Sequence, residues 1–130
     1  MSFLTPGKKN LITDVKGLYI GNSENELINT GSTILTCEDR FVASYKVLGG
    51  APGTRETDLL EPDKLVEKID ALVLSGGSAF GLEAASETVN LLRKDNKGYS
   101  VSNTKVPIVP SAIIFDLSLI HISEPTRPIA

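Results

Sequence analysis

The sequence has few of the residues that build disulfide frameworks, metal centres or membrane spans. Of its 130 residues one is cysteine, one is histidine, none is tryptophan, and 5% are aromatic. The single cysteine, Cys37, cannot form an internal disulfide, and its place at the end of an apolar run indicates a buried thiol. No apolar run approaches the roughly 20 residues that a spanning helix needs. We therefore expect no membrane insertion, no metal and no cofactor.

The sequence also lacks a large excess of charge of either sign, although its charged content of 22% is ordinary for a soluble globular chain. The formal net charge is −3, and there is no basic stripe to attract nucleic acid, so we predict no nucleic-acid partner. The first residues lack the charged start and long apolar stretch of a signal peptide, which favours a cytoplasmic protein. A hydrophobic content of 41% over this length is typical of one modest soluble domain.

The end of the sequence differs in character from the rest. The stretch from Leu117 to Arg127 resembles a translated sequencing adaptor, and such segments do not belong in fold reasoning. We therefore predict that residues 1–116 are authentic and that residues 117–130 are a non-native tail. The only histidine, His121, falls in this tail, so we expect no catalytic or metal role for it.

Patterning of the remaining residues predicts a mixture of strands and helices, of the α+β or layered α/β class. The pattern predicts a hairpin of Ser32–Cys37 with Phe41–Val47, and a helix starting at Pro62. A brief strand at 71–74 then leads through a glycine turn into a helix over 79–94, with Ser78 as its N-cap. Two apolar segments, 106–109 and 112–115, are expected to be extended, the first at an edge or in a loop because of its prolines.

The turn Gly76-Gly77-Ser78 is the first candidate site. A strand, a glycine turn and a helix start together present free N–H groups, which bind phosphate, carboxylate or a developing oxyanion. The turn lacks the Lys-Ser/Thr pair of a P-loop and the third glycine of a dinucleotide fingerprint. The alternative is a tight turn packed against a neighbouring element, and spacing alone favours that alternative.

Two further groups of polar residues have both a functional and a structural interpretation. Arg55, Glu56 and Asp58 follow a Gly-Pro-Gly turn, where they either bind substrate or pair with one another and pin the loop. The residues alone favour pinning. Asn103-Thr104 has the form of a self-cleavage point, but its polar surroundings favour a surface loop.

Four motifs in order resemble the self-processing hydrolase family of the L-aminopeptidase/D-esterases, β-peptidyl aminopeptidases and nylon-oligomer hydrolases. The resemblance covers about Asn10 to Asp116. Its motifs are Leu11–Gly17, Gly49–Asp58, Leu74–Leu82 and Val106–Asp116.

The resemblance implies an αββα sandwich similar to N-terminal nucleophile hydrolases. It also implies self-cleavage before a Ser or Thr whose hydroxyl then attacks short peptides, amides or esters. Assembly into homo-oligomers is implied as well.

The sequence departs from the family pattern in three ways. The family's nucleophile lies well downstream of residue 116, so we expect no catalytic residue in this chain. Some members have a tyrosine where this chain has Phe115, which keeps the ring but loses the hydroxyl. The β-peptidyl branch has a glutamate at the position of Ile113 to hold the substrate amine. Because isoleucine cannot do so, we do not expect β-peptidyl specificity.

These observations predict the N-terminal part of an autoprocessing peptidase or amide hydrolase, truncated and inactive by itself. The predicted pocket residues are Gly76, Gly77, Ser78, Ile113 and Phe115, and the predicted structural loop is Arg55, Glu56 and Asp58. The alternative is a small α/β module that binds an anion or another ligand at the 76–78 turn.

Overall fold

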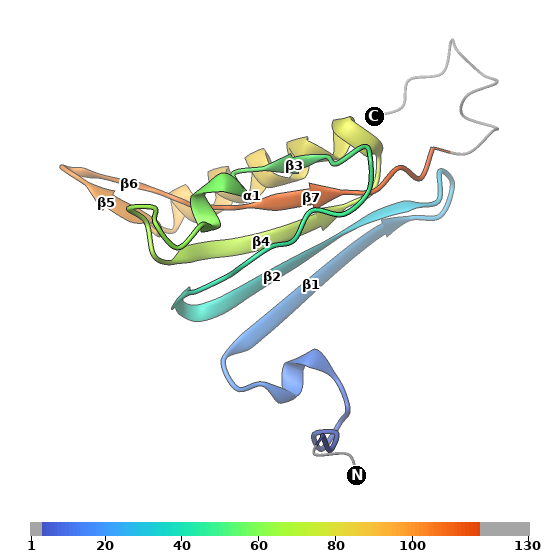
Figure 1. The fold of residues 1–130 in the computed structure, drawn as a ribbon, viewed down its shortest axis with the longest axis horizontal. Helices are drawn as coiled ribbons and strands as arrows, with labels where there is room; N and C mark the ends of the chain where they lie inside the picture. Colours follow the sequence, from blue (N-terminus) through green and yellow to red (C-terminus); the bar gives the residue numbers. More distant parts are fainter. Residues whose placement is uncertain (1–3, 118–130) are drawn as a thin grey trace.

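The computed structural model describes residues 4–117, in which one α-helix lies on a five-stranded mixed sheet (Figure 1). The sheet order is β1-β2-β4-β7-β3. The pairs β1–β2, β2–β4 and β3–β7 are antiparallel, and β4–β7 is parallel. The sheet strands are β1 (Leu18–Asn25), β2 (Thr30–Phe41), β3 (Thr54–Arg55), β4 (Ile69–Ser75) and β7 (Ser111–Ile113).

The connection from β4 to its parallel neighbour β7 contains most of the remaining elements. It begins with the 3-10 helix η3 (Ser78–Leu82), continues as α1 (Glu83–Lys94), and ends in the hairpin of β5 (Tyr99–Val101) and β6 (Thr104–Val106). Two shorter 3-10 helices, η1 (Ile12–Asp14) and η2 (Asp58–Leu60), lie outside this connection. The mixed sheet and the single α-helix fit the expected α+β class. Within residues 4–117, no helix has both the length and the apolar character to cross a membrane.

The core lies between α1 and one face of the sheet. Ala71 and Val73 of β4, Ala85 of α1 and Val109 are completely buried there. Because side chains alternate across a strand, Leu72 and Leu74 point to the opposite face. Leu74 is 59% exposed, so the face of the sheet away from α1 is only partly covered.

The predicted hairpin of Ser32–Cys37 with Phe41–Val47 is wrong. β2 runs unbroken through Glu38, and its hairpin partner is β1, which pairs with it from Leu18↔Cys37 to Asn25↔Thr30. The polar residues expected to turn the chain instead contact neighbouring strands. Glu38 accepts a 2.7 Å hydrogen bond from the Tyr19 hydroxyl.

The predicted helix from Pro62 to Ile69 is also absent. Leu65 is 85% exposed, so it has no core to pack against, while Ile69 is buried as the first residue of β4. A single short turn without apolar packing does not repay the cost of helix nucleation. The predicted strand at 71–74 and the helix over 79–94 are confirmed, although the first turn of that helix is η3.

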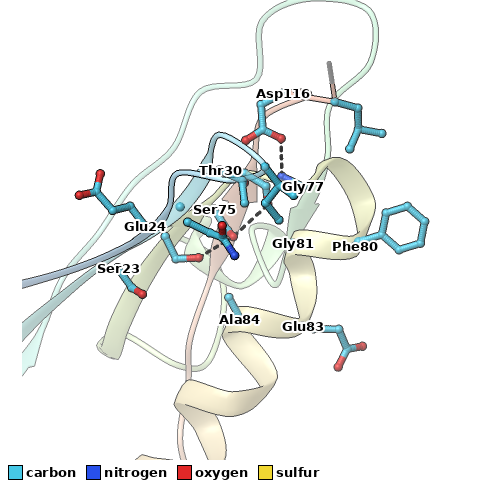
Figure 2. Close-up of a pocket in the computed structure, with 16 residues that line it drawn as sticks. Ser23, Glu24, Thr30, Ser75, Gly77, Phe80, Gly81, Glu83, Ala84 and Asp116 are labelled. Atoms are coloured by element: carbon cyan, nitrogen blue, oxygen red, sulfur yellow. Dashed lines mark hydrogen bonds between the residues drawn. The ribbon is translucent and has the colours of Figure 1, made fainter. Parts of the chain in front are cut away.

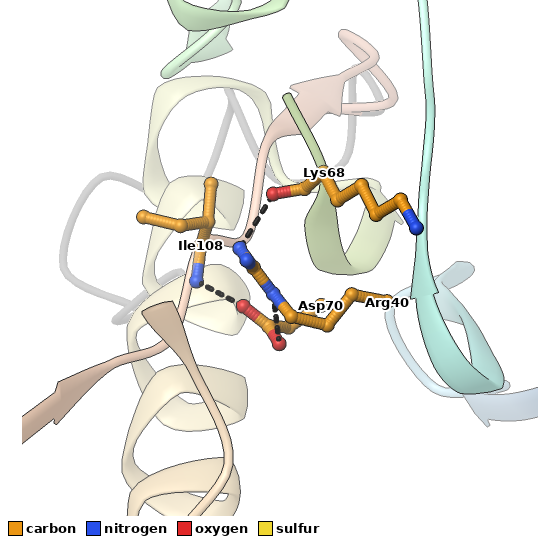
Figure 3. A network of polar contacts seen from close by, with 4 residues as sticks. All are labelled: Arg40, Lys68, Asp70 and Ile108. Atoms are coloured by element: carbon orange, nitrogen blue, oxygen red, sulfur yellow. Dashed lines mark hydrogen bonds and ion pairs between the residues drawn. The ribbon is translucent and has the colours of Figure 1, made fainter. Parts of the chain in front are cut away.

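The segment 106–109 was expected at an edge or in a loop; Val106 ends β6, and residues 107–110 have no strand assignment. These residues are nevertheless buried and lie against β4. Asp70 N–H donates to Ile108 O at 2.9 Å, and Val73 N–H donates to Pro110 O at 3.1 Å. Figure 3 shows that the Asp70 carboxylate accepts the Ile108 N–H at 2.8 Å and pairs with Arg40 Nε at 3.1 Å. A side chain thus completes the pairing that the prolines interrupt.

Candidate functional site

The main cleft lies where the turn after β4 meets the β1–β2 hairpin and the start of α1 (Figure 2). Its volume is about 560 Å³, within the range of small-molecule sites. A second, larger hollow of about 740 Å³ adjoins it and shares eight lining residues with it, among them Thr30, Gly76 and Asp116. The main cleft is lined by Ser23, Glu24, Asn25, Ile28, Thr30, Gly31, Ser32, Ser75, Gly76, Gly77, Phe80, Gly81, Glu83, Ala84, Asp116 and Leu117.

The turn at the cleft has two consecutive residues in the left-handed backbone region. Gly77 has φ 92° and Ser78 has φ 54°. Glycine adopts this region freely, whereas a residue with a Cβ does so at a cost of about 1–2 kcal/mol. Strain of this kind persists only where surrounding contacts hold the backbone, and it concentrates at functional sites. The turn is therefore held by its surroundings.

Those contacts engage all three N–H groups of the turn. Gly76 N–H donates to Gly31 O at 2.8 Å, and Ser78 N–H donates to Ile114 O at 3.0 Å. Gly77 N–H donates to the Asp116 carboxylate at 2.7 Å (Figure 2). The turn therefore has the geometry of a tight, packed connection, and a side chain of the chain itself occupies the donor that an external anion would need. This arrangement does not favour the anion-binding alternative.

Two serine hydroxyls line the cleft as a hydrogen-bonded pair. Ser75 Oγ donates to Gly76 O at 3.0 Å, and Ser32 Oγ lies 2.7 Å from Ser75 Oγ. Either serine can be the donor of the bond between them. Both hydroxyl oxygens also have lone pairs that accept hydrogen bonds, so the pair adds acceptors to the cleft.

The charged residues of the cleft are all acidic. Glu24, Glu83 and Asp116 line it, and no lysine, arginine or histidine is among its described lining residues. Together with the Ser32 oxygen, these carboxylates present acceptors and negative charge. The cleft is therefore complementary to a ligand with N–H donors and positive charge.

The structure brings only part of the predicted pocket together. Gly76 and Gly77 line the cleft, whereas Ser78, Ile113 and Phe115 do not. Ile113 packs behind the turn, in the space next to Gly53 and Gly81. Phe115 is 68% exposed. The prediction of Ser78 as N-cap is wrong, because Gly77 holds that position and no side chain caps the helix.

The predicted structural loop is fastened by a different contact from the expected one. Arg55 Nη1 donates to Ser86 Oγ of α1, and no ion pair joins Arg55 to Glu56 or Asp58 among the described residues. Glu56 instead has a left-handed backbone, at φ 56°, and Asp58 begins η2. Arg55 thus ties the loop to the helix.

Sequence reasoning missed Asp116 and Thr30 as cleft residues. Asp116 is the last residue of the fourth sequence motif, and Thr30 belongs to none of the four motifs. The register of β2 with β4, which sets Ser32 opposite Ser75, places Thr30 next to Gly76. A hydrogen bond across 39 residues connects Asp116 to the turn, and no local sequence signal reports such a contact.

Other predicted positions lie outside the cleft or outside the described residues. Asn103 lies in the exposed turn between β5 and β6, as the surface-loop interpretation expected. No group of three or more potential metal ligands occurs within residues 4–117. His121 and the predicted tail beyond Leu117 lie outside the described residues.

Comparisons with known proteins find similarity to a peptidase family and to uncharacterized aminopeptidases. The sequence pattern of peptidase family S58 matches residues 10–130. The chain is 41% identical over 116 residues to the uncharacterized aminopeptidase Rv1333 of Mycobacterium tuberculosis and to its counterpart Mb1368 of Mycobacterium bovis. It is 40% identical over 118 residues to the uncharacterized aminopeptidase ML1167 of Mycobacterium leprae. These matches cover 83–85% of the chain but only 33–34% of the relatives, so the chain spans about a third of their length.

Proposed function

Because this chain belongs to peptidase family S58, we propose that it is the N-terminal part of an autoprocessing hydrolase that cleaves short peptides, amides or esters. The observation that carries this proposal is the 41% identity, over most of the chain, to proteins named as aminopeptidases. The family match over residues 10–130 supports it independently. The chain's share in the activity is to form one wall of the substrate pocket.

The cleft geometry supports a substrate with an amino group. An acceptor-rich lining with Glu24 and Glu83 complements the ammonium at the start of a peptide. Ile28 and Ala84 line the same cleft and provide apolar contact for a side chain. A cleft of about 560 Å³ accommodates the end of a short peptide.

We further propose that the complete protein is an αββα sandwich. One face of the present sheet packs against α1, while Leu74 on the other face is 59% exposed. A second sheet with its own helices would bury that face, as in other two-layer arrangements of sheets. The relatives are about three times as long as this chain, which leaves ample length for a second layer.

In the proposed mechanism, the chain supplies positioning and a later part of the protein supplies the attack. A Ser or Thr, freed at its amino end by self-cleavage, adds its hydroxyl oxygen to the substrate carbonyl while an amine takes the proton. Hydrogen-bond donors around the carbonyl stabilise the resulting oxyanion. The leaving amine takes a proton, and water then releases the acyl group from the nucleophile.

The test compares the full-length protein with the chain alone. Aminoacyl-p-nitroanilide turnover and intact mass are measured for both proteins. We expect turnover and two processed fragments from the full-length protein, and neither from the chain. Turnover by the chain, or a cut within residues 1–116, would contradict the proposal, as would an unprocessed, inactive full-length protein.

A further inference from the structure

Asp116 lies where the two hollows of the cleft meet. It is one of eight residues that line both the main cleft and the second hollow, and Gly76 and Thr30 are two of the others. Its Oδ1 accepts the Gly77 N–H at 2.7 Å, and its Oδ2 fills the place that a side chain on Gly76 would occupy. The same carboxylate therefore holds one residue of the turn and requires its neighbour to lack a side chain.

The centre of the turn is held by the Asp116 side chain, because backbone hydrogen bonds hold only the positions on either side of it. Ile114 N–H donates to Ser75 O at 2.9 Å and Ser78 N–H donates to Ile114 O at 3.0 Å, so backbone bonds fix the positions on either side of the turn. Gly77, between them, donates to the Asp116 side chain. The left-handed backbone at Gly77 and Ser78 thus rests on a side-chain contact at its centre.

We propose that Asp116 is a positioning residue: its carboxylate on the Gly77 N–H fixes the turn at 76–78 and thereby the part of the main cleft's wall that Gly76 and Gly77 form. This inference rests on the proposed function only for its kinetic consequence. Truncating Asp116 removes the acceptor of Gly77 but leaves the β4–β7 pairing and its flanking backbone bonds in place. The wall then relaxes while the sheet remains intact.

The experiment uses the full-length protein with Asp116→Ala, Asp116→Asn and the control Asp63→Ala. Asp63 is a surface residue whose side chain is 78% exposed. Steady-state kcat and KM are measured with an aminoacyl-p-nitroanilide, and the Gly77 amide is followed by NMR hydrogen exchange and proton shift. Asparagine keeps a carbonyl oxygen as an acceptor for Gly77 but loses the charge.

For Asp116→Ala we expect KM to rise about tenfold with kcat within about threefold, since relaxing a binding wall weakens ground-state and transition-state binding alike. Gly77 exchange should accelerate in the same variant. Asp116→Asn should restore KM to within about threefold, with the Gly77 amide proton moved upfield because a neutral acceptor binds it more weakly. Asp63→Ala should match the wild type in every measurement.

Three results would overturn the proposal: native KM in Asp116→Ala, asparagine as impaired as alanine, or an unchanged Gly77 amide in both variants. If the wild-type protein turns over no nitroanilide, the proposed function fails, and the Gly77 amide still decides the role of Asp116. If Asp116→Ala does not fold, the Gly77 proton shift in Asp116→Asn decides, since it moves only when the two groups are bonded.

Discussion

Asp70 and Ile108 exchange two hydrogen bonds, one through the Asp70 backbone and one through its side chain. Asp70 N–H donates to Ile108 O at 2.9 Å, and Ile108 N–H donates to Asp70 Oδ2 at 2.8 Å (Figure 3). The other carboxylate oxygen pairs with Arg40 Nε at 3.1 Å. Since the Asp70 side chain is 5% exposed, this contact joins β2, β4 and the segment before β7 without help from solvent.

Asp70→Ala should therefore destabilise the chain strongly. The substitution leaves the Ile108 N–H buried without an acceptor and removes the carboxylate from Arg40 Nε, at an expected cost of about 3 kcal/mol. Equilibrium urea unfolding followed by circular dichroism measures the change. Asp63→Ala is the matched control, because its pair with Lys64 is exposed and 3.6 Å long, and it should change stability by less than about 0.5 kcal/mol. Equal effects of the two substitutions would contradict this assignment.

Gly81→Ala should disturb the cleft where Gly81 lines it. A Cβ at this position would overlap the Gly76 carbonyl oxygen and crowd Ile113. Overpacking of this kind costs about 1–3 kcal/mol because the backbone has to shift. Gly50→Ala is the control, since nothing lies within 4 Å of its Cβ position, and it should be neutral or slightly stabilising. Urea unfolding of both variants tests the difference, and a neutral Gly81→Ala would argue against the close approach.

The helix and its preceding strand were predictable because both are determined by local pattern. Leu82, Ala85, Val89 and Leu92 recur at helical spacing, and α1 packs Ala85, Val89 and Leu92 toward the core. The strand before the helix is short and apolar, and the glycines that follow it predict the position of the turn. The resemblance to the family predicted pocket residues in the same turn, and two of them, Gly76 and Gly77, line the cleft.

The remaining errors came from interactions between segments far apart in the sequence. Glu38 lies in a polar run that is typical of a turn, but its bond to Tyr19 belongs to β1–β2 pairing. Arg55 was expected to pair with the acids beside it, yet Ser86 lies 31 residues away. Asp116 was missed for the same reason, because its partner Gly77 is 39 residues away. Local spacing carries no information on such partners, which depend on sheet order.

Ser111→Ala should be neutral or raise stability by up to about 1 kcal/mol. Ser111 is 4% exposed, and its Oγ is a buried polar atom with no hydrogen-bond partner. Burying an unpaired hydroxyl costs free energy, so its removal recovers part of that cost. The free energy of unfolding from urea titration measures the effect.

Ser75→Ala serves as the contrast, because Ser75 is similarly buried but makes two hydrogen bonds. Its removal should cost about 1–2 kcal/mol. A large loss in Ser111→Ala, comparable to that in Ser75→Ala, would show that Ser111 has a partner after all.

Cys37 should react slowly with thiol reagents in the folded chain. Cys37 is half-buried, so the predicted buried thiol is only partly removed from solvent. This partial burial still raises the pKa of the thiol, and the nearby Asp39 raises the pKa further. Because only the thiolate reacts, alkylation by iodoacetamide at pH 8 should be at least about threefold slower in the folded chain than in urea. Because the pKa of the Cys37 thiol is higher in the folded chain than in the unfolded chain, the protonated thiol contributes to the free energy of unfolding. That contribution is fully present below the unfolded pKa and is lost as pH rises through the folded pKa. Asp39→Asn should quicken alkylation by less than unfolding does, since burial is the larger cause. Cys37→Ser gives the background rate, and equal folded and unfolded rates would refute the assigned environment.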